Sequence, residues 1–356
     1  MKRMLRFPGL KASMAIALAL LSSTRPARAD DSCDPNTGGP PADVYLGPSG
    51  EQFYPANQSC PDHIVAPSCE GGTRLVYQDP QDPNHLVRYA CLSSPGGTAA
   101  LPMLVFLHPS RIDSVDYVFG GSGGKKPSTD LVAQSSTALL GKTRGYIVLM
   151  PQGRCLKAPA ESSGDGTRFD VFYKDRDKNL DIRAIRAFIA QVKTRQTFDD
   201  TGKPVSLSNV PAVDAKRVFL MDWSNGGYMA HLLALFWPAE FTAAASFAGA
   251  DPFARPPCPV PYPKVSRKPP IAVVHSECDP VLPCSEVEDW LSALKGLGWP
   301  DSSLDDIVTD ASHTQRVHEC GTTSSSRQRQ CPATAHFLFA NPQLPTMFGF
   351  LRKFHL

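Results

Sequence analysis

The chain between residues 217 and 230 reads Arg217-Val218-Phe219-Leu220-Met221-Asp222-Trp223-Ser224-Asn225-Gly226-Gly227-Tyr228-Met229-Ala230. The apolar run that ends at Met221 predicts a buried strand, and the apolar residues after Gly227 recur at helical spacing. Ser224 lies between these two elements, and the glycines after it permit a sharp turn. Such a strand-to-helix turn is a nucleophile elbow, which presents a serine hydroxyl beside the N-terminus of a helix.

Ser224 is therefore the candidate nucleophile. The alternative is a structural N-cap, a common role of serine at a helix start. The sequence Ser-Asn-Gly-Gly behind a buried strand is more specific than a cap requires, so we favour the nucleophile. An elbow normally has glycine two residues before the serine. Here Asp222 stands at that position, and its side chain needs room in the turn.

The rest of the chain predicts the sheet around this turn. Short apolar runs without alternation, typical of strands buried on both faces of a parallel sheet, cover residues 101–107, 146–150, 217–221, 243–247 and 271–274. Helical patterns between and after them cover residues 182–192, 229–236, 285–297 and 347–354. Residues 73–78 and 86–91 alternate as an antiparallel hairpin would. We expect an α/β fold, a doubly wound and mostly parallel sheet with an antiparallel N-terminal edge.

The N-terminus indicates the cellular compartment. A basic leader, an apolar run over residues 14–21 and the small-residue site Ala27-Arg28-Ala29 are typical of a secretory signal peptide. The apolar run is too short to span a bilayer. We expect residues 1–29 to be removed and the mature protein to be extracellular or periplasmic.

Composition narrows the class of protein. Of the 356 residues, 42% are hydrophobic and 20% are charged, as in an ordinary globular protein. The net charge of +2 gives no electrostatic reason to expect nucleic acid or an anionic membrane as partner. In an oxidising compartment the ten cysteines predict up to five disulfides. Sequence proximity favours the pair Cys278–Cys284, and then Cys320–Cys331.

A base and an acid should follow the serine in the chain. Asp279 lies in a proline-rich turn just past the predicted strand 271–274, where a buried carboxylate can orient an imidazole. The alternatives for the acid are a plain Asp-Pro turn at this position, Glu277 or Asp222. His336 lies near the C-terminus after a possible final strand over residues 331–335, and it is the candidate base. Two further histidines, His313 and His318, compete for this role, with His313 the main rival.

An oxyanion intermediate needs hydrogen-bond donors as well. One expected donor is the main-chain N–H of Asn225, directly after the serine. The other should come from the loop after the strand 101–107. Because Pro109 has no N–H to donate, Ser110 is the candidate and Arg111 the second choice. His108 and His275 end predicted strands, and we expect them to be hydrogen-bonded scaffold residues.

Taken together, these stretches resemble the secreted esterases grouped with poly(3-hydroxybutyrate) depolymerases and bacterial feruloyl or acetyl-xylan esterases. The resemblance runs from about residue 100 to the C-terminus. Its marks are Leu107-His108-Pro109, Val213-Asp214 ahead of Arg217-Val218, Ser224-Asn225-Gly226-Gly227, Pro238 with Phe241 and Ala248-Gly249, and His275 through Asp279 to Val281 and Pro283. The paired cysteines of tannase-type esterases are absent.

This resemblance implies an α/β-hydrolase fold over residues 73–356, preceded by a Cys/Pro-rich extension over residues 30–72. It implies a serine esterase that forms an acyl-enzyme and uses no cofactor. The expected substrate is an ester of a feruloylated or acetylated glycan, or a hydroxyalkanoate oligomer or polyester. Trp223, beside the serine, could contact an aromatic acyl group or belong to the core. We expect a monomer.

Three weaker alternatives remain. Asp222 in the elbow would also suit a catalytically silent protein of the same fold that binds a glycan or polymer. Asp175, Asp177, Asn179 and Asp181 alternate like part of a calcium loop, but they lack its glycine and closing glutamate, so a solvated turn is favoured. A zinc site from His313, His318, Cys320 and Cys331 is disfavoured, because cysteines of secreted proteins usually pair with each other.

Overall fold

The computed structural model describes residues 33–39, 67, 69, 71–83, 85–110, 131–137, 139–140, 143–156, 166–255, 258–317, 320, 332, 334–337 and 339–356. The predicted signal peptide and most of the predicted extension lie outside these residues. In the described part of the chain, no helix is long and apolar enough to cross a membrane.

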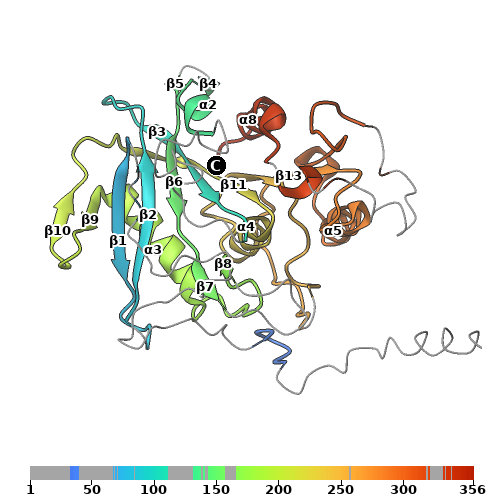
Figure 1. The fold of residues 1–356 in the computed structure, drawn as a ribbon, viewed down its shortest axis with the longest axis horizontal. Helices are drawn as coiled ribbons and strands as arrows, with labels where there is room; N and C mark the ends of the chain where they lie inside the picture. Colours follow the sequence, from blue (N-terminus) through green and yellow to red (C-terminus); the bar gives the residue numbers. More distant parts are fainter. Residues whose placement is uncertain are drawn as a thin grey trace, which may run out of the picture.

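An eight-stranded sheet runs through the molecule in the order β1-β2-β6-β3-β11-β12-β13-β14 (Figure 1). Its strands are β1 (Thr73–Gln78), β2 (Val87–Ser93), β3 (Leu101–Leu107), β6 (Ile147–Pro151), β11 (Val213–Trp223), β12 (Ala243–Phe247), β13 (Ile271–Ser276) and β14 (Leu304–Thr309). β2 pairs antiparallel with β1 and with β6, and all other neighbours are parallel. Counted along the chain, the order is 1-2-4-3-5-6-7-8, the order of the α/β-hydrolase fold. The predicted fold class is confirmed.

Helices cover both faces of this sheet. They are α2 (Leu131–Thr137), α3 (Leu180–Thr194), α4 (Asn225–Phe236), α5 (Cys284–Gly296), α7 (Thr334–Phe337) and α8 (Leu344–Leu351), with short 3-10 turns at Asp301–Ser303 and Asn341–Gln343. α2 and α8 contact each other on one face, while α3 and α4 lie on the other (Figure 1). α5 packs beside α4, where the rings of His231 and Trp290 lie 5.3 Å apart. Every residue of β3, β6, β12 and β13 is buried, which explains their continuous apolar runs.

Three small antiparallel pairs flank the main sheet. They are β4 (Leu139–Leu140) with β5 (Thr143–Arg144), β7 (Arg154–Leu156) with β8 (Gly166–Arg168), and β9 (Gln196–Phe198) with β10 (Pro204–Ser206). The β7–β8 pair joins residues 154–156 to residues 166–168, and Gly153, just before β7, contacts His108 just after β3. This placement matters for the site described below.

The C-terminal part of the sheet differs from the prediction. Among the described residues the last strand is β14, Leu304–Thr309, and Thr334 and Ala335, predicted to end a strand, begin a helix instead. Residues 331 and 333 of that predicted strand lie outside the described part of the chain. His336 lies on the same short helix, α7. β14 was missed because two aspartates, Asp305 and Asp306, interrupt its apolar pattern at the edge of the sheet.

The disulfides also correct the sequence prediction. Three bridges have both cysteines in the described part of the chain: Cys33–Cys258, Cys69–Cys91 and Cys284–Cys320. Cys284 therefore does not pair with Cys278, and Cys320 does not pair with Cys331. Cys278 is itself disulfide-bonded. Cys284 is the first residue of α5, and its partner comes from beyond the next strand.

Candidate functional site

The three side chains singled out in sequence converge at the carboxyl edge of the sheet. Ser224 directly follows β11, and Asp279 lies three residues after the end of β13. His336 reaches the same edge from α7. Because parallel strands end on the same side of a sheet, residues more than 50 positions apart in the chain meet here.

Ser224 has the backbone of a strained turn. Its φ is 54° and its ψ is −114°, a combination that a residue with a side chain rarely adopts. Its N–H donates to the Phe247 carbonyl at 2.8 Å, which fixes the turn against β12. Ser224 is the N-cap of α4, yet its hydroxyl makes no capping hydrogen bond to that fully described helix. The hydroxyl instead lies 2.9 Å from Nε2 of His336.

Close packing explains the two glycines after the serine. A Cβ at Gly226 would lie 2.1 Å from the Leu107 carbonyl oxygen, and one at Gly227 would lie 2.6 Å from Cα of Gly249. Either contact is far inside van der Waals distance. Glycine is therefore required for α4 to start this close to β3 and β12.

Asp222 occupies a sealed position beneath the turn. Its side chain is fully buried, and Oδ1 accepts a 2.5 Å hydrogen bond from the Ser246 hydroxyl. Oδ2 has no hydrogen-bond partner among the described residues. Burial raises the pKa of the Asp222 carboxyl well above its usual range. Gly227 makes room for this side chain, because a Cβ there would lie 2.8 Å from Oδ1.

His336 and Asp279 form a buried pair. Nδ1 of His336 lies 2.8 Å from Oδ2 of Asp279. The other oxygen, Oδ1, accepts the main-chain N–H groups of Val281 and Leu282, both at 2.8 Å. Neither oxygen can therefore move without breaking a hydrogen bond. A carboxylate at Nδ1 holds the proton there and leaves Nε2 free to accept the hydrogen bond of Ser224.

The rival histidine has a different environment. His313 is buried, and its ring meets the Phe247 ring edge-on at 4.9 Å between centroids. Its Nδ1 lies 2.9 Å from the Thr309 hydroxyl. That hydroxyl donates to the His275 carbonyl, so the His313 ring is the donor in this pair. His318 and Arg111 lie outside the described residues.

Asn225, the first expected oxyanion donor, is fixed by its side chain. Oδ1 accepts the N–H of Phe169 at 2.8 Å, and Nδ2 donates to the Phe169 carbonyl at 3.2 Å. This two-point clamp was not predicted from sequence. The Asn225 main-chain N–H belongs to the first turn of α4, where no carbonyl of the helix is available to accept it.

Ser110, the second expected donor, follows a buried histidine. The His108 ring lies 2.7 Å from the Pro109 carbonyl through Nδ1, and Nε2 accepts the N–H of Gly153 at 2.8 Å. Burial lowers the pKa of His108 to about 4, so the ring is neutral and makes both contacts at once. A Cβ at Gly153 would lie 2.6 Å from the Arg168 carbonyl oxygen. Glycine therefore permits this approach. His275 is also hydrogen-bonded, to Asp306 at 2.7 Å.

An ion cluster supports the residues that hold both expected donors. Asp181, on the first turn of α3, is fully buried and accepts hydrogen bonds from Arg88 at 2.6 Å and from Arg154 at 3.0 Å. It also accepts the N–H of Asp170 at 2.7 Å. The two guanidinium groups hold the pKa of Asp181 well below its usual range despite its burial. Residues 153 and 169, which bind His108 and Asn225, adjoin two members of this cluster.

Trp223 belongs to the core. It is 3% exposed and packs between the rings of Phe247 and Phe339. Its indole N–H donates to the main-chain carbonyl of His336 at 2.9 Å. The structure therefore supports a core role for Trp223 and not contact with an aromatic acyl group. It also adds a contact to His336 that sequence reasoning missed.

The weaker metal hypotheses gain no support from the residues that can be placed. Asn179 caps α3 through its side chain, and Asp181 is bound to two arginines. The side-chain oxygens of both residues are thus already engaged by other groups of the protein. Cys320 is in a disulfide, while His318 and Cys331 lie outside the described residues. Among the described residues, the one group of potential metal-ligating side chains is His275, Cys284 and Cys320.

Comparison with known proteins yields likeness to solved structures only. No protein-family model matches the chain, and no curated protein matches it. A thermostable esterase superposes with a TM-score of 0.48 and 16% identity, covering 83% of this chain and 65% of its own length. A putative dienelactone hydrolase from Klebsiella pneumoniae superposes with a TM-score of 0.44 and 16% identity, covering 79% of this chain and 98% of its own.

A third similar structure is the enterobactin esterase of Shigella flexneri, with a TM-score of 0.42 and 14% identity over 82% of this chain and 64% of its own. The chain therefore spans about two thirds of the length of two of these three proteins. Its own strand order defines the fold as that of the α/β-hydrolases.

Proposed function

We propose that this protein is a secreted serine carboxylic ester hydrolase in which Ser224, His336 and Asp279 form the catalytic triad. The observation that carries the proposal is the continuous hydrogen-bonded line from the Ser224 hydroxyl through the His336 ring to the Asp279 carboxylate, at 2.9 and 2.8 Å. Within hydrogen-bond reach, the imidazole can take the hydroxyl proton as the serine attacks.

The reaction would proceed through an acyl-enzyme. The Ser224 oxygen adds to the ester carbonyl carbon while its proton moves to Nε2 of His336. The imidazolium then gives that proton to the alcohol oxygen as the C–O bond breaks. Water repeats the sequence and releases the carboxylic acid. Asp279, held by two main-chain N–H groups, stabilises the imidazolium in both halves of the reaction.

The tetrahedral intermediate carries a negative oxygen that needs donors. We assign this role to the main-chain N–H groups of Asn225 and Ser110, which the Phe169 and Gly153 contacts hold in place. Loss of one such donor reduces kcat by about 10²–10³-fold in other serine hydrolases. The positive end of α4 adds to the same stabilisation.

The substrate class rests on the sequence resemblance. It favours an ester of a feruloylated or acetylated glycan, or a hydroxyalkanoate oligomer or polyester, acted on by a secreted monomer. Release of ferulate from feruloylated arabinoxylan, of acetate from acetylated xylan and of hydroxybutyrate from its oligomers would separate these classes. Failure on all three, with turnover of a simple aryl ester, would reject the substrate class and keep the esterase.

Labelling of the purified protein with a fluorophosphonate tests the nucleophile. We expect one covalent adduct on Ser224, absent in Ser224→Ala. His336→Ala should abolish turnover of p-nitrophenyl acetate, whereas His313→Ala should retain it if it folds. A folded wild-type protein that is not labelled would overturn the proposal. Loss of turnover in His313→Ala alone would reassign the base.

A catalytically silent protein that binds a glycan or polymer is the second candidate. The observation that favours it is Asp222 at the usual glycine position, because a buried carboxyl there could disturb the turn. Its geometry weakens this alternative, since Gly227 accommodates Asp222 and the Ser224 hydroxyl still reaches His336. Turnover that disappears in Ser224→Ala would exclude it.

A further inference from the structure

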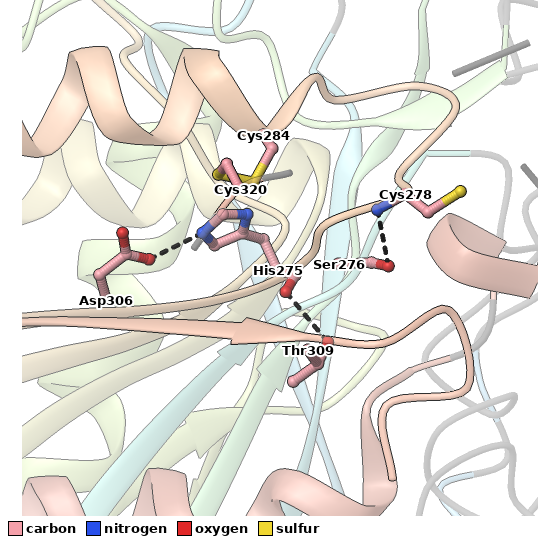
Figure 2. Close-up of a disulfide and its surroundings, with 7 residues drawn as sticks. All are labelled: His275, Ser276, Cys278, Cys284, Asp306, Thr309 and Cys320. Carbon is pink, nitrogen blue, oxygen red and sulfur yellow. Dashed lines mark hydrogen bonds and ion pairs between the residues drawn. A yellow bond between two sulfur atoms is a disulfide. The ribbon is translucent and has the colours of Figure 1, made fainter. Parts of the chain in front are cut away.

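A second histidine–aspartate pair lies beside a disulfide. His275 is the penultimate residue of β13, and its Nε2 lies 2.7 Å from Oδ1 of Asp306 on the neighbouring strand β14. The imidazole lies against the Cys284–Cys320 bridge (Figure 2). One nitrogen of His275 and the two sulfur atoms all lie within 4.8 Å of one another. These four side chains are not part of the proposed esterase site.

The second nitrogen of the His275 imidazole is available to bind another group. The His275 side chain is fully buried, and its Nδ1 has no hydrogen-bond partner among the described residues. Because Nε2 is occupied by Asp306, Nδ1 is the nitrogen available to sulfur. A buried polar nitrogen without a partner is unfavourable. A cysteine sulfur released from the disulfide would provide that partner, since a thiol or thiolate can share a proton with Nδ1.

The two sulfurs of the bridge have unequal surroundings. Cys284 is 6% exposed and is the first residue of α5, whose N-cap, Pro283, makes no side-chain hydrogen bond to the helix. A helix N-terminus and a neighbouring histidine both stabilise a cysteine thiolate. Cys320 is half-buried and therefore more open to solvent. Figure 2 shows the sulfur of Cys278 pointing away from this bridge, so Cys278 does not compete for it.

We propose that the Cys284–Cys320 bridge is a thiol–disulfide exchange site that reacts with dithiols, with His275 and Asp306 stabilising the Cys284 leaving group. The attacking thiolate forms a bond to Sγ of Cys320. The Cys284–Cys320 bond breaks, and its electron pair remains on Cys284. The second thiol of the reagent then displaces Cys320 and closes its own disulfide. The dithiol is oxidised by two electrons, and its two protons pass to Cys320 and to the Cys284–His275 pair.

The Cys69–Cys91 bridge provides a control within the same chain. It closes a loop of similar size, with a sequence separation of 22 against 36 for Cys284–Cys320. Chain entropy therefore differs little between the two bridges. Both sulfurs of the control are buried, and Cys69 starts no helix.

Equilibration of the full protein with graded ratios of reduced to oxidised dithiothreitol tests the proposal. After an acid quench and alkylation, peptide mass spectrometry reads the reduced fraction of each bridge. We expect Cys284–Cys320 to be half-reduced at a ratio at least tenfold lower than Cys69–Cys91. An equilibrium measurement is insensitive to which bridge is merely easier to reach.

Variants of His275 separate the effect of this imidazole on reduction of the Cys284–Cys320 bridge from the effect of the bridge's exposure to solvent. His275→Gln retains an amide donor for Asp306 and removes Nδ1, and it should raise the ratio needed for half-reduction by about tenfold, the effect of one lost hydrogen bond. If this variant does not fold, Asp306→Asn should shift the ratio in the same direction. Half-reduction of both bridges at one ratio, or no shift in a folded variant, would overturn the proposal. Neither readout depends on esterase activity.

Discussion

The indole N–H of Trp223 donates to the main-chain carbonyl of His336 at 2.9 Å. Trp223, directly before the candidate nucleophile, is therefore hydrogen-bonded to the main chain of His336, the candidate base. Two segments more than 100 positions apart in the chain are joined by a second contact, independent of the Ser224–His336 hydrogen bond. This arrangement makes Trp223 a positioning residue in the proposed mechanism.

Trp223→Phe tests this role. The phenyl ring keeps most of the packing against Phe247 and Phe339 but removes the N–H, so helix α7, which carries His336, loses one of its supports. We expect kcat for p-nitrophenyl acetate to fall about tenfold with little change in KM, because a small displacement of a catalytic group has this effect. Trp299→Phe is the matched control. It removes an indole hydrogen bond of 2.8 Å to the Pro269 carbonyl, at the opposite edge of the sheet, and should leave kcat unchanged. Equal losses in both variants would contradict the role.

The side-chain clamp of Asn225 should matter as much as its main-chain N–H. Asn225→Asp keeps the acceptor for Phe169, loses the donor and places a negative charge beside the proposed oxyanion site. We expect kcat to fall by about a hundredfold, measured in steady-state kinetics. Asn225→Ala separates the loss of the clamp from the added charge, because it removes the clamp without adding a charge. Its kcat should fall less than that of Asn225→Asp. Wild-type rates in both variants would rule out Asn225 as a support of the oxyanion site.

Asp222 should make the protein less stable as pH rises. Its pKa in the folded state is raised well above the usual 3.8. Below pH 3.8 the carboxyl is protonated in both the folded and the unfolded state, so its ionisation costs the folded state no stability. Above it, the unfolded chain releases the proton first, and the free energy of unfolding falls by about 1 kcal/mol per pH unit up to the folded-state pKa. Urea titrations of wild type and Asp222→Asn between pH 4 and 7 measure this. The free energy of unfolding of the wild type, relative to that of Asp222→Asn, should fall as the pH rises. A difference that stays constant with pH would refute the raised pKa of Asp222.

The buried cluster around Asp181 should be sensitive to removal of this carboxylate, which both arginines bind. Asp181→Asn takes from the buried Arg88 and Arg154 the carboxylate that both contact, and we expect a loss of about 3–5 kcal/mol in the free energy of unfolding. The control is Asp200→Asn, which breaks the exposed ion pair with Arg74 and should change stability by less than about 1 kcal/mol. Thermal and urea denaturation of both variants test the difference. A small effect of Asp181→Asn would show that water reaches the cluster.

Relief of backbone strain should separate stability from activity at Ser224. Glycine adopts φ 54° and ψ −114° without steric penalty, so Ser224→Gly should unfold at a higher temperature than wild type. We expect a gain of about 1 kcal/mol together with complete loss of fluorophosphonate labelling. Ser224→Ala retains the strain and should show no comparable gain. A destabilised glycine variant would mean that the Ser224–His336 contact outweighs the strain.

The central strands could be predicted from sequence because they are buried on both faces. Residues 101–107 and 243–247 coincide with β3 and β12, where every residue is buried and the apolar run is unbroken. β14 could not be found this way. It lies at the sheet edge, and Asp305 and Asp306 give it a polar surface that resembles a loop. Thr334 and Ala335 were predicted to end a strand over residues 331–335, but they begin helix α7, whose four residues are too few to show a period.

The candidate catalytic residues could be predicted from sequence better than the contacts that hold the site in place. The structure brings Ser224, Asp279 and His336 together, although only the serine turn has a strong local signature. The contacts of Asn225 with Phe169 and of His108 with Gly153 join segments more than 40 positions apart, and no sequence spacing reveals them. Disulfide pairing failed for the same reason. Cys278 is near Cys284 in the chain, but the start of α5 brings Cys284 to Cys320.

Both proposed oxyanion donors depend on residues 152–156 and 166–170, and through them on Asp181. For library design, both stretches are best left unchanged. Randomising 152–156 or 166–170 would remove these supports of the proposed oxyanion site, even at positions that no substrate reaches.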